Sequence, residues 1–164
     1  ILPGVGAFDD AMNKFNISGL RDGVEKMILN NKIPLLGVCV GMQMLAESSD
    51  EGSEKGLGWI NSSVKIFDAK TIKNNTKLPH MGWNTIDIIS KNEPLFKDLE
   101  QESSFYFLHS YYFDCKDKKN IISETEYGNR YTSAVRSDNI YGVQFHPEKS
   151  HKNGITLLNN FSNL

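Results

Sequence analysis

The sequence lacks the long apolar runs and the cysteine clusters that mark membrane proteins and disulfide-stapled scaffolds. No apolar run approaches the roughly 18 residues that a transmembrane helix needs, so we expect no membrane association. Only two cysteines, Cys39 and Cys115, occur in 164 residues. They could pair in principle, but a secreted scaffold of this size usually carries more cysteines. Reduced thiols and a cytoplasmic location are the expectation.

Excess basic charge and the common metal-binding and phosphate-binding motifs are also missing. The net charge is −2, which gives no basic field for nucleic acid. Histidines and cysteines are scattered, without the C-x-x-C or H-x-x-x-H spacing of metal ligands. Neither G-x-x-x-x-G-K nor G-x-G-x-x-G occurs, so no phosphate loop is present. We therefore expect no metal, no cofactor and no nucleic-acid partner.

The composition that remains is that of an ordinary globular domain. Hydrophobic residues make up 39% and charged residues 23% of the chain, and no linker divides it, so residues 1–164 are expected to form a single domain. The sequence opens ILPGVG rather than with methionine. This opening resembles the end of a strand running into a glycine turn, so we expect an N-terminal segment to be missing.

The order of patterns along the chain predicts a mixed sheet. Early residues alternate strand ends with helices, as parallel βαβ units do, whereas the second half carries closely spaced strands that favour antiparallel pairing. Helices are expected near residues 11–15, 20–28, 41–47 and 154–161. Strands are expected at residues 33–38, 59–67, 83–89, 105–113, 121–127, 131–136 and 141–145, with a loop over residues 48–58.

The most informative short stretch is Gly37-Val38-Cys39-Val40-Gly41, where an apolar run meets helix-forming residues. Glycines on both sides of a nucleophile permit a sharp turn from strand to helix that exposes the side chain. The start of a helix would also lower the pKa of the Cys39 thiol. An inert cysteine buried in the core is the competing interpretation, and the residues alone leave both open.

A candidate base for such a nucleophile follows the last predicted strand. His146 and Glu148 flank Pro147, and in an extended segment residues two apart project to the same side. The carboxylate can then hold one imidazole nitrogen while the other faces a partner, as in a catalytic triad. A His-x-Glu pair without a partner is instead an ordinary surface feature, so the pair needs Cys39 nearby to be informative.

The remaining histidines and the glycine-rich opening have weaker signals. His80 and His109 have no carboxylate at a matching spacing, so structural or positioning roles suit them better, and His151 is expected to be exposed. Gly4 and Val5 lie at a predicted strand end that could sit beside the Cys39 turn in a parallel sheet. Their backbone N–H groups are candidate oxyanion donors, with a simple glycine turn as the alternative.

Together these segments resemble the class I (triad-type) glutamine amidotransferases, which carry G-x-C-x-G and a later H-P-E. The stretches ILPGVGAF, GVCVGMQ, PHMGWN, HSYY and QFHPEKS, taken in this order, look like the glutaminase subunits of imidazole glycerol phosphate synthase. The resemblance implies an α/β, three-layer, flavodoxin-like fold. Its central sheet would be mixed and mostly parallel, with helices on both faces, and would lack its first strand here.

The resemblance also implies roles for individual residues. The catalytic triad would be Cys39, His146 and Glu148. Backbone at the oxyanion site would come from Gly4, Val5 and Val40. Contacts to L-glutamine would come from Gln43, Glu51, Ser110 and Tyr111. The partner would be a (β/α)8-barrel cyclase in a heterodimer, with interface candidates Trp83, Asn84, Tyr111 and Lys149, for which ordinary surface or core packing is the alternative.

The function implied by the resemblance is hydrolysis of L-glutamine to glutamate and ammonia, which the cyclase uses in histidine biosynthesis. Two alternatives stay open at this point. A paralogous amidotransferase could supply ammonia to a synthase of surface-polysaccharide sugars, with the same active-site motifs. A non-catalytic regulatory subunit could keep the fold, although intact Cys39, His146 and Glu148 speak against it.

Overall fold

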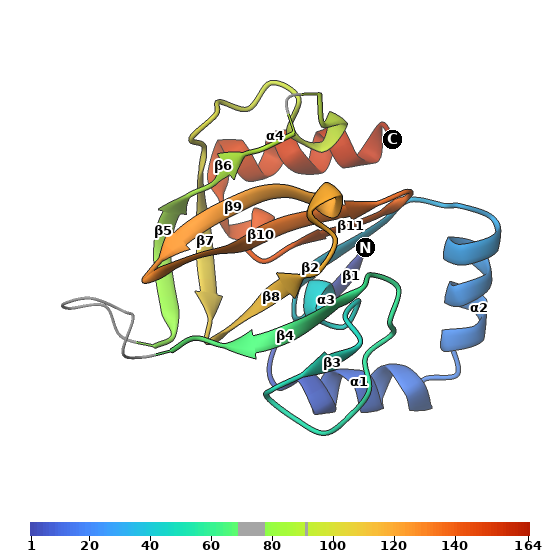
Figure 1. Cartoon of the computed structure of the whole chain (residues 1–164). Helices are drawn as coiled ribbons and strands as arrows, with labels where there is room; N and C mark the ends of the chain where they lie inside the picture. The colour runs from blue at the N-terminus through green and yellow to red at the C-terminus, as the bar shows by residue number, and fades with distance from the viewer. Residues whose placement is uncertain (69–77, 91) are drawn as a thin grey trace.

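A mixed sheet of nine strands forms the centre of the molecule (Figure 1). The computed structural model describes residues 1–68, 78–90 and 92–164. The strands are β1 (Leu2–Gly4), β2 (Leu35–Cys39), β3 (Ser48–Ser49), β4 (Ser62–Ile66), β5 (His80–Thr85), β6 (Asp87–Ile88), β7 (Ser104–His109), β8 (Tyr111–Cys115), β9 (Ile121–Tyr127), β10 (Asn129–Ser137) and β11 (Ile140–Val143). Strands β5 and β7 form a separate antiparallel pair.

The helices are short. They are α1 (Phe8–Ile17), α2 (Arg21–Glu25), a π-helix η1 (Lys26–Asn30), α3 (Val40–Gln43) and α4 (His151–Ser162). Short 3-10 turns are η2 (Pro94–Phe96), η3 (Lys118–Asn120) and η4 (Pro147–Lys149). In the described part of the chain, no helix is long and apolar enough to cross a membrane.

The strand order β1-β2-β11-β10-β8-β4-β3 joins a parallel part to an antiparallel part. Strands β1, β2 and β11 run parallel to one another, as do β3 and β4. Strand β10 pairs antiparallel with β11, β8 and β9. The predicted mixed sheet is confirmed, but most strand pairs are antiparallel rather than parallel, because short turns between the later strands leave no room for crossover helices.

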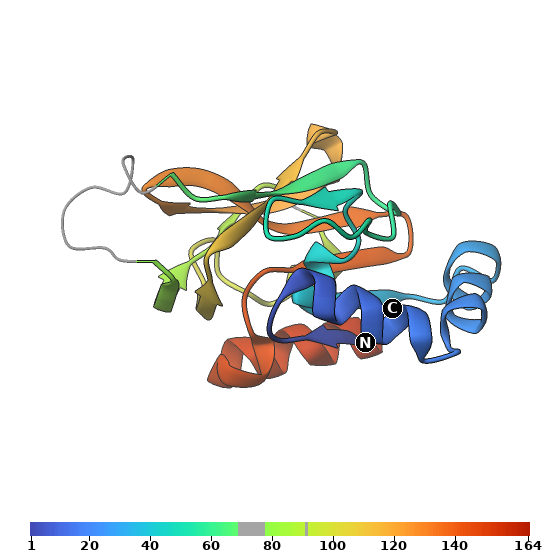
Figure 2. The same cartoon turned by 90° about the horizontal axis from the view of Figure 1, so that it is seen from below.

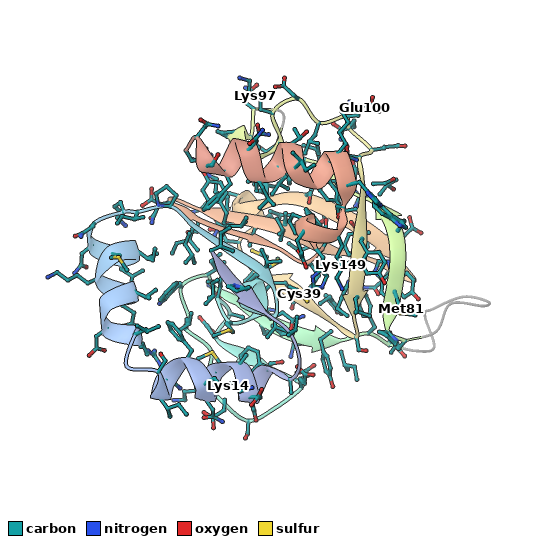
Figure 3. The ribbon with its side chains drawn as sticks, turned by 180° about the vertical axis from the view of Figure 1, so that it is seen from behind. Lys14, Cys39, Met81, Lys97, Glu100 and Lys149 are labelled. Atoms are coloured by element: carbon teal, nitrogen blue, oxygen red, sulfur yellow. The ribbon has the colours of Figure 1, made fainter. Side chains whose placement is uncertain are left out.

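Helices cover both faces of the parallel part, as the three-layer expectation requires. Helix α4 lies on one side of β1 and β2, and helix α1 lies on the other (Figures 1 and 3). Phe8 and Met12, one turn apart on α1, and Leu157 of α4 are fully buried. Helix α2 lies at the opposite end of the molecule from β5 and β7 (Figures 1 and 2).

Several predicted elements differ in detail from the structure. The helix expected at 41–47 ends at Gln43, and the loop expected at 48–58 contains the short strand β3. The strand expected at 105–113 divides at Ser110 into β7 and β8, and the strand at 83–89 divides into β5 and β6. The helix expected at 20–28 continues as the π-helix η1. Of the predicted apolar stripe only Ile28 is buried, while Leu20 and Met27 are exposed. Leu20 precedes α2, and the wider turn of η1 breaks the α-helical spacing at Met27.

Aromatic side chains form a buried cluster where β7 meets the segment after β11. Phe105, Phe107 and Phe145 are fully buried. The rings of Phe105 and Phe145 stack with centroids 4.1 Å apart, and Phe145 immediately precedes His146. This packing therefore fixes the strand end that presents the imidazole.

Truncation of Phe105 tests how much stability this cluster supplies. Phe105→Ala should lower the free energy of unfolding by about 3–5 kcal/mol, because it removes a buried ring and leaves a cavity. Urea denaturation followed by circular dichroism measures the change. Ile155→Ala is the control, because Ile155 on α4 is 66% exposed and should change stability by less than about 0.5 kcal/mol. Equal effects of the two substitutions would contradict this account of the core.

Candidate active site

Cys39 lies at a strained turn between β2 and α3, as the sequence predicted. Its backbone has φ 55° and ψ −114°, in the left-handed half of φ space that non-glycine residues avoid. Gly37 and Gly41 are required because neighbouring backbone atoms leave no room for a side chain at either position. A Cβ on Gly41 would lie 1.8 Å from the carbonyl oxygen of Leu2, and one on Gly37 would lie 2.7 Å from the carbonyl oxygen of Gly41.

A cavity of about 170 Å³ opens beside this turn. Nine of the predicted site residues and three further residues line it: Val5, Gly6, Cys39, Val40, Gln43, Glu51, Leu108, His109, Ser110, Tyr111, His146 and Lys149. Lys149 lies beside Cys39 in the view from behind (Figure 3). The turn after β2, the segment after β11 and the junction of β7 and β8 thus meet at one place.

The sulfur of Cys39 is buried and its thiol is neutral at pH 7. Burial is the main reason that the pKa of Cys39 is raised to about 11, although the backbone N–H of Val40, which bonds the sulfur, acts in the opposite direction. The thiol donates to the carbonyl of Leu108 at 3.9 Å. The expected net lowering of the Cys39 pKa is wrong: the N–H group that begins α3 does act to lower it, but α3 has only four residues and desolvation outweighs this effect.

His146 and Glu148 adopt the paired arrangement that their spacing suggested. The Nδ1 atom of His146 lies 2.7 Å from Oε1 of Glu148. His146 is buried against the cavity, while the Glu148 side chain is about half exposed and does not line the cavity. The backbone N–H of His146 donates to the carbonyl of Tyr106 at 2.8 Å, so β7 also holds this segment.

Gln144 is a site residue that the sequence reasoning missed. It is fully buried, and its Nε2 donates to the Cys39 sulfur at 3.8 Å. Its Oε1 accepts from Nε2 of Gln43 at 3.0 Å. The signal was available in the sequence, because Gln144 lies two residues before His146 in an extended segment and so faces the same side.

Gln43 and Tyr111 line the cavity but already bond each other. Nε2 of Gln43 donates to the carbonyl of Tyr111 at 3.3 Å. The same carbonyl accepts from Nδ1 of His109 at 2.7 Å. The Tyr111 carbonyl thus links Gln43 to His109, and Ser110 occupies the bend between β7 and β8.

Glu51 joins the loop after β3 to the start of α1. Its Oε2 accepts from the backbone N–H of Phe8 at 2.9 Å. At the next residue of α1, the Asp9 carboxylate accepts from the backbone N–H groups of Ser53 and Glu54, and these bonds lower the pKa of Asp9. This loop is thus clamped to α1, with Glu51 at the wall of the cavity.

The three predicted oxyanion residues fall into two groups. Val5 and Val40 line the cavity, whereas Gly4 does not. Gly4 pairs with Cys39 in the parallel ladder, and a Cβ at Gly4 would lie 2.7 Å from the backbone nitrogen of Gly41. Its place in the structure is that of a close contact between β1 and α3. Gly6, at φ 91°, lines the cavity in its stead.

Of the predicted interface residues, Tyr111 and Lys149 line the cavity, whereas Trp83 and Asn84 lie on β5. Lys149 lines the cavity, and its Nζ lies 5.7 Å from the ring centre of Tyr106. Trp83 on β5 is 51% exposed and stacks on His151 with ring centres 5.2 Å apart. Asn84 is half-buried and donates to the carbonyl of Glu126 at 2.9 Å. His151 is exposed, as expected.

Comparison with known proteins places this chain in a class. The family model for class I glutamine amidotransferases matches residues 1–163. The chain belongs to the class I glutamine amidotransferases.

Among its relatives are proteins named imidazole glycerol phosphate synthase subunit HisH. The one from Leptospira borgpetersenii is 53% identical over 164 residues, which are the whole of this chain and 80% of that protein. The protein named HisH 2 from Methanococcus maripaludis is 54% identical over 161 residues, 98% of this chain and 78% of that protein.

Solved structures of the same class share the fold. A glutamine amidotransferase from Thermotoga maritima has a TM-score of 0.60 at 20% identity, covering 98% of this chain and 59% of that chain. The glutaminase domain of Trypanosoma brucei CTPS has a TM-score of 0.61 at 18% identity, covering 98% of this chain and 69% of that chain.

The raised pKa of Cys39 predicts how its reactivity depends on pH. Alkylation by iodoacetamide requires the thiolate, so with a pKa near about 11 the rate should rise about tenfold per pH unit between pH 7 and 10. Mass spectrometry of the Cys39 peptide measures the rate and separates it from that of Cys115. A rate that already reaches its plateau at pH 8 would contradict the burial of the sulfur.

Proposed function

We propose that this chain is the glutaminase subunit of an imidazole glycerol phosphate synthase, with Cys39, His146 and Glu148 as its catalytic triad. The observation that carries the proposal is the Cys39 sulfur on a strained turn in the cavity that His146 also lines. Identity near 50% to the named relatives over the whole chain supports the choice of enzyme.

In the proposed reaction, His146 removes the proton from the Cys39 thiol as L-glutamine binds. The sulfur attacks the side-chain amide carbon, and backbone N–H groups at Val40 and near Val5 receive the negative oxygen. His146 then gives its proton to the departing nitrogen, and ammonia leaves. Water, deprotonated by the same imidazole, hydrolyses the glutamyl thioester and frees glutamate and the thiol.

Glu148 and the buried state of Cys39 have complementary roles in this scheme. The carboxylate 2.7 Å from Nδ1 stabilises the imidazolium that forms when His146 takes the proton. A neutral resting thiol avoids oxidation and modification, because the thiolate is the reactive form. Both cysteines are free, and a free catalytic thiol suits the reducing cytoplasm, which we propose as the location.

The glutamine itself would be held by groups already at the cavity wall. Glu51 carries a negative charge that suits the amino group of the substrate, and Gln43, Ser110 and the Tyr111 backbone supply hydrogen-bonding groups. The proposed partner is a (β/α)8-barrel cyclase that covers the cavity mouth at Trp83, Asn84 and Lys149. Ammonia is mostly protonated in neutral water, so it serves synthesis only when it passes directly to such a partner.

Substitution of the triad tests the catalytic assignment. Cys39→Ala should lower glutamine hydrolysis by about 10⁴-fold or more, and Glu148→Gln by a smaller factor of about 10²–10⁴, because the neutral amide keeps the geometry but loses the charge. Glutamate release measures both. Cys115→Ala is the matched control and should hydrolyse glutamine at the parental rate. Parental activity in Cys39→Ala would disprove the nucleophile assignment.

The partner is tested by the response of the enzyme to a cyclase. With the histidine-pathway cyclase and its ribulosyl formimino nucleotide, glutamine should support formation of imidazole glycerol phosphate. Trp83→Ala should weaken this complex by about 2 kcal/mol, or about thirtyfold in Kd, as exposed aromatic anchors do. Ile17→Ala, at a more exposed site on α1, should leave Kd unchanged. Glutamine hydrolysis without any response to this cyclase would favour a polysaccharide-pathway partner instead.

A further inference from the structure

A buried row of polar side chains runs from β5 to the cavity. Tyr131 of β10 lies between two histidines, with its hydroxyl 3.1 Å from Nδ1 of His80 and 3.2 Å from Nε2 of His109. Nε2 of His80 lies 3.3 Å from Nδ2 of Asn84, at the half-buried outer end. All three ring side chains are buried.

The Tyr111 carbonyl, at the end of the row nearest the cavity, fixes which group donates in each hydrogen bond. The Tyr111 carbonyl can only accept, so Nδ1 of His109 carries the proton. Burial lowers the pKa of His109 to about 3, so its ring is neutral and its Nε2 is an acceptor. The Tyr131 hydroxyl, which also contacts Thr125, therefore donates to His109 in the arrangement that leaves Nε2 of His109 with a partner.

The same logic extends outward to the surface. With its one proton committed to His109, the Tyr131 oxygen accepts from Nδ1 of His80. Burial lowers the pKa of His80 to about 4, so its remaining nitrogen is an acceptor, and the Asn84 amide donates to it. The four side chains thus have one mutually consistent arrangement of protons.

The inner end of the row continues to the nucleophile. The Tyr111 carbonyl accepts from His109 and also from Gln43. Gln43 donates to Gln144, whose Nε2 donates to the Cys39 sulfur. The orientation of both amide side chains therefore depends on where the Tyr111 carbonyl lies.

Aromatic packing holds the row rigid. The His80 ring is stacked between Tyr127 and Phe107, at centroid distances of 3.9 and 4.7 Å. Within the described residues, no buried side-chain nitrogen or oxygen lacks a hydrogen-bond partner. A fully satisfied buried network has one low-energy arrangement, so it specifies geometry to a degree that an apolar core of the same volume does not.

We propose that Tyr131 and His109 are positioning residues for glutamine hydrolysis: the chain Asn84–His80–Tyr131–His109 fixes the Tyr111 carbonyl, and through Gln43 and Gln144 it aims a donor at the Cys39 sulfur. The proposal rests on the proposed function. It adds that a one-directional hydrogen-bond chain, which starts beside the exposed Trp83, sets the reactivity of the Cys39 thiol.

The test uses Tyr131→Phe in the purified protein, with Ser133→Ala as the matched control. Ser133 lies two residues further along β10. It forms a buried hydrogen bond with Ser123 at 2.9 Å, which is not part of the hydrogen-bond chain from Asn84 to His109. Tyr131→Phe should slow iodoacetamide alkylation of Cys39 about three- to tenfold at pH 8–9, because one lost donor to the thiolate raises the pKa by about half a unit to one unit. Ser133→Ala should leave this rate unchanged.

The charges that face Cys39 stay the same in both variants, since Glu51, Glu148 and Lys149 are untouched. The kcat for glutamine should fall about ten- to a hundredfold in Tyr131→Phe with little change in KM, as expected when catalytic groups shift by about 1 Å. Alkylation and kcat equal to those of Ser133→Ala would overturn the proposal. Alkylation of Cys39 can be measured even if the protein has no glutaminase activity. A failure of the proposed function can therefore be distinguished from a failure of this proposal.

A substitution at the outer end covers the case in which Tyr131→Phe does not fold. Asn84→Asp keeps the shape but replaces the donor to His80 by an acceptor, so His80 must place its proton on the other nitrogen. The Tyr131 hydroxyl then turns to His80 and leaves His109 without its donor. Alkylation of Cys39 should slow at least threefold, whereas Asn84→Ser, which can still donate, should restore most of the rate. An unchanged rate in Asn84→Asp would also overturn the proposal.

Discussion

The close contact between β1 and α3 is the constraint on which the site depends. The α-carbon of Gly41 lies so near the Leu2 carbonyl that no side chain fits between them. Because Gly4 pairs with Cys39 in the same parallel ladder, the turn after β2 is held on two sides. A backbone strained by about 1–3 kcal/mol at Cys39 persists only when its surroundings fix it in this way. These backbone contacts therefore hold the sulfur toward the cavity.

Burial of that sulfur sets the chemistry that follows. Desolvation keeps the thiol neutral, and the short helix α3 cannot reverse this. In the proposed mechanism the reaction then depends on a base that is ready when glutamine arrives. The pairing of His146 with Glu148 supplies a position for the imidazolium charge, at a strand end that Phe145 anchors in the core. In this mechanism the buried surroundings of Cys39 make its thiol unreactive at rest and make its activation depend on proton transfer to His146.

Local patterns in the sequence predicted the parts of the site whose geometry is local. The glycines around Cys39 and the His146-x-Glu148 spacing specify conformations within a few residues, so they could be read directly. The raised pKa of Cys39 and the place of Gly4 outside the cavity were missed, because each depends on segments far apart in the chain. Gln144 was missed although its spacing from His146 is a local signal, because its contact with the sulfur also requires β2 to lie beside β11. The bend at Ser110 was missed for the same reason, since it forms where two sheets meet.

The hydrogen-bond chain from Asn84 to His109 lies where the nine-stranded sheet meets the β5–β7 pair. Cys39 ends β2 and His146 follows β11, both strands of the parallel part, whereas His109 and Tyr111 belong to the antiparallel strands β7 and β8. Strand β10 pairs with both β11 and β8, and it carries Tyr131. A shift of one part against the other would separate the nucleophile from the wall that holds glutamine. Directional hydrogen bonds resist such sliding better than apolar contacts, which tolerate small displacements, so a buried polar link is best placed at this seam.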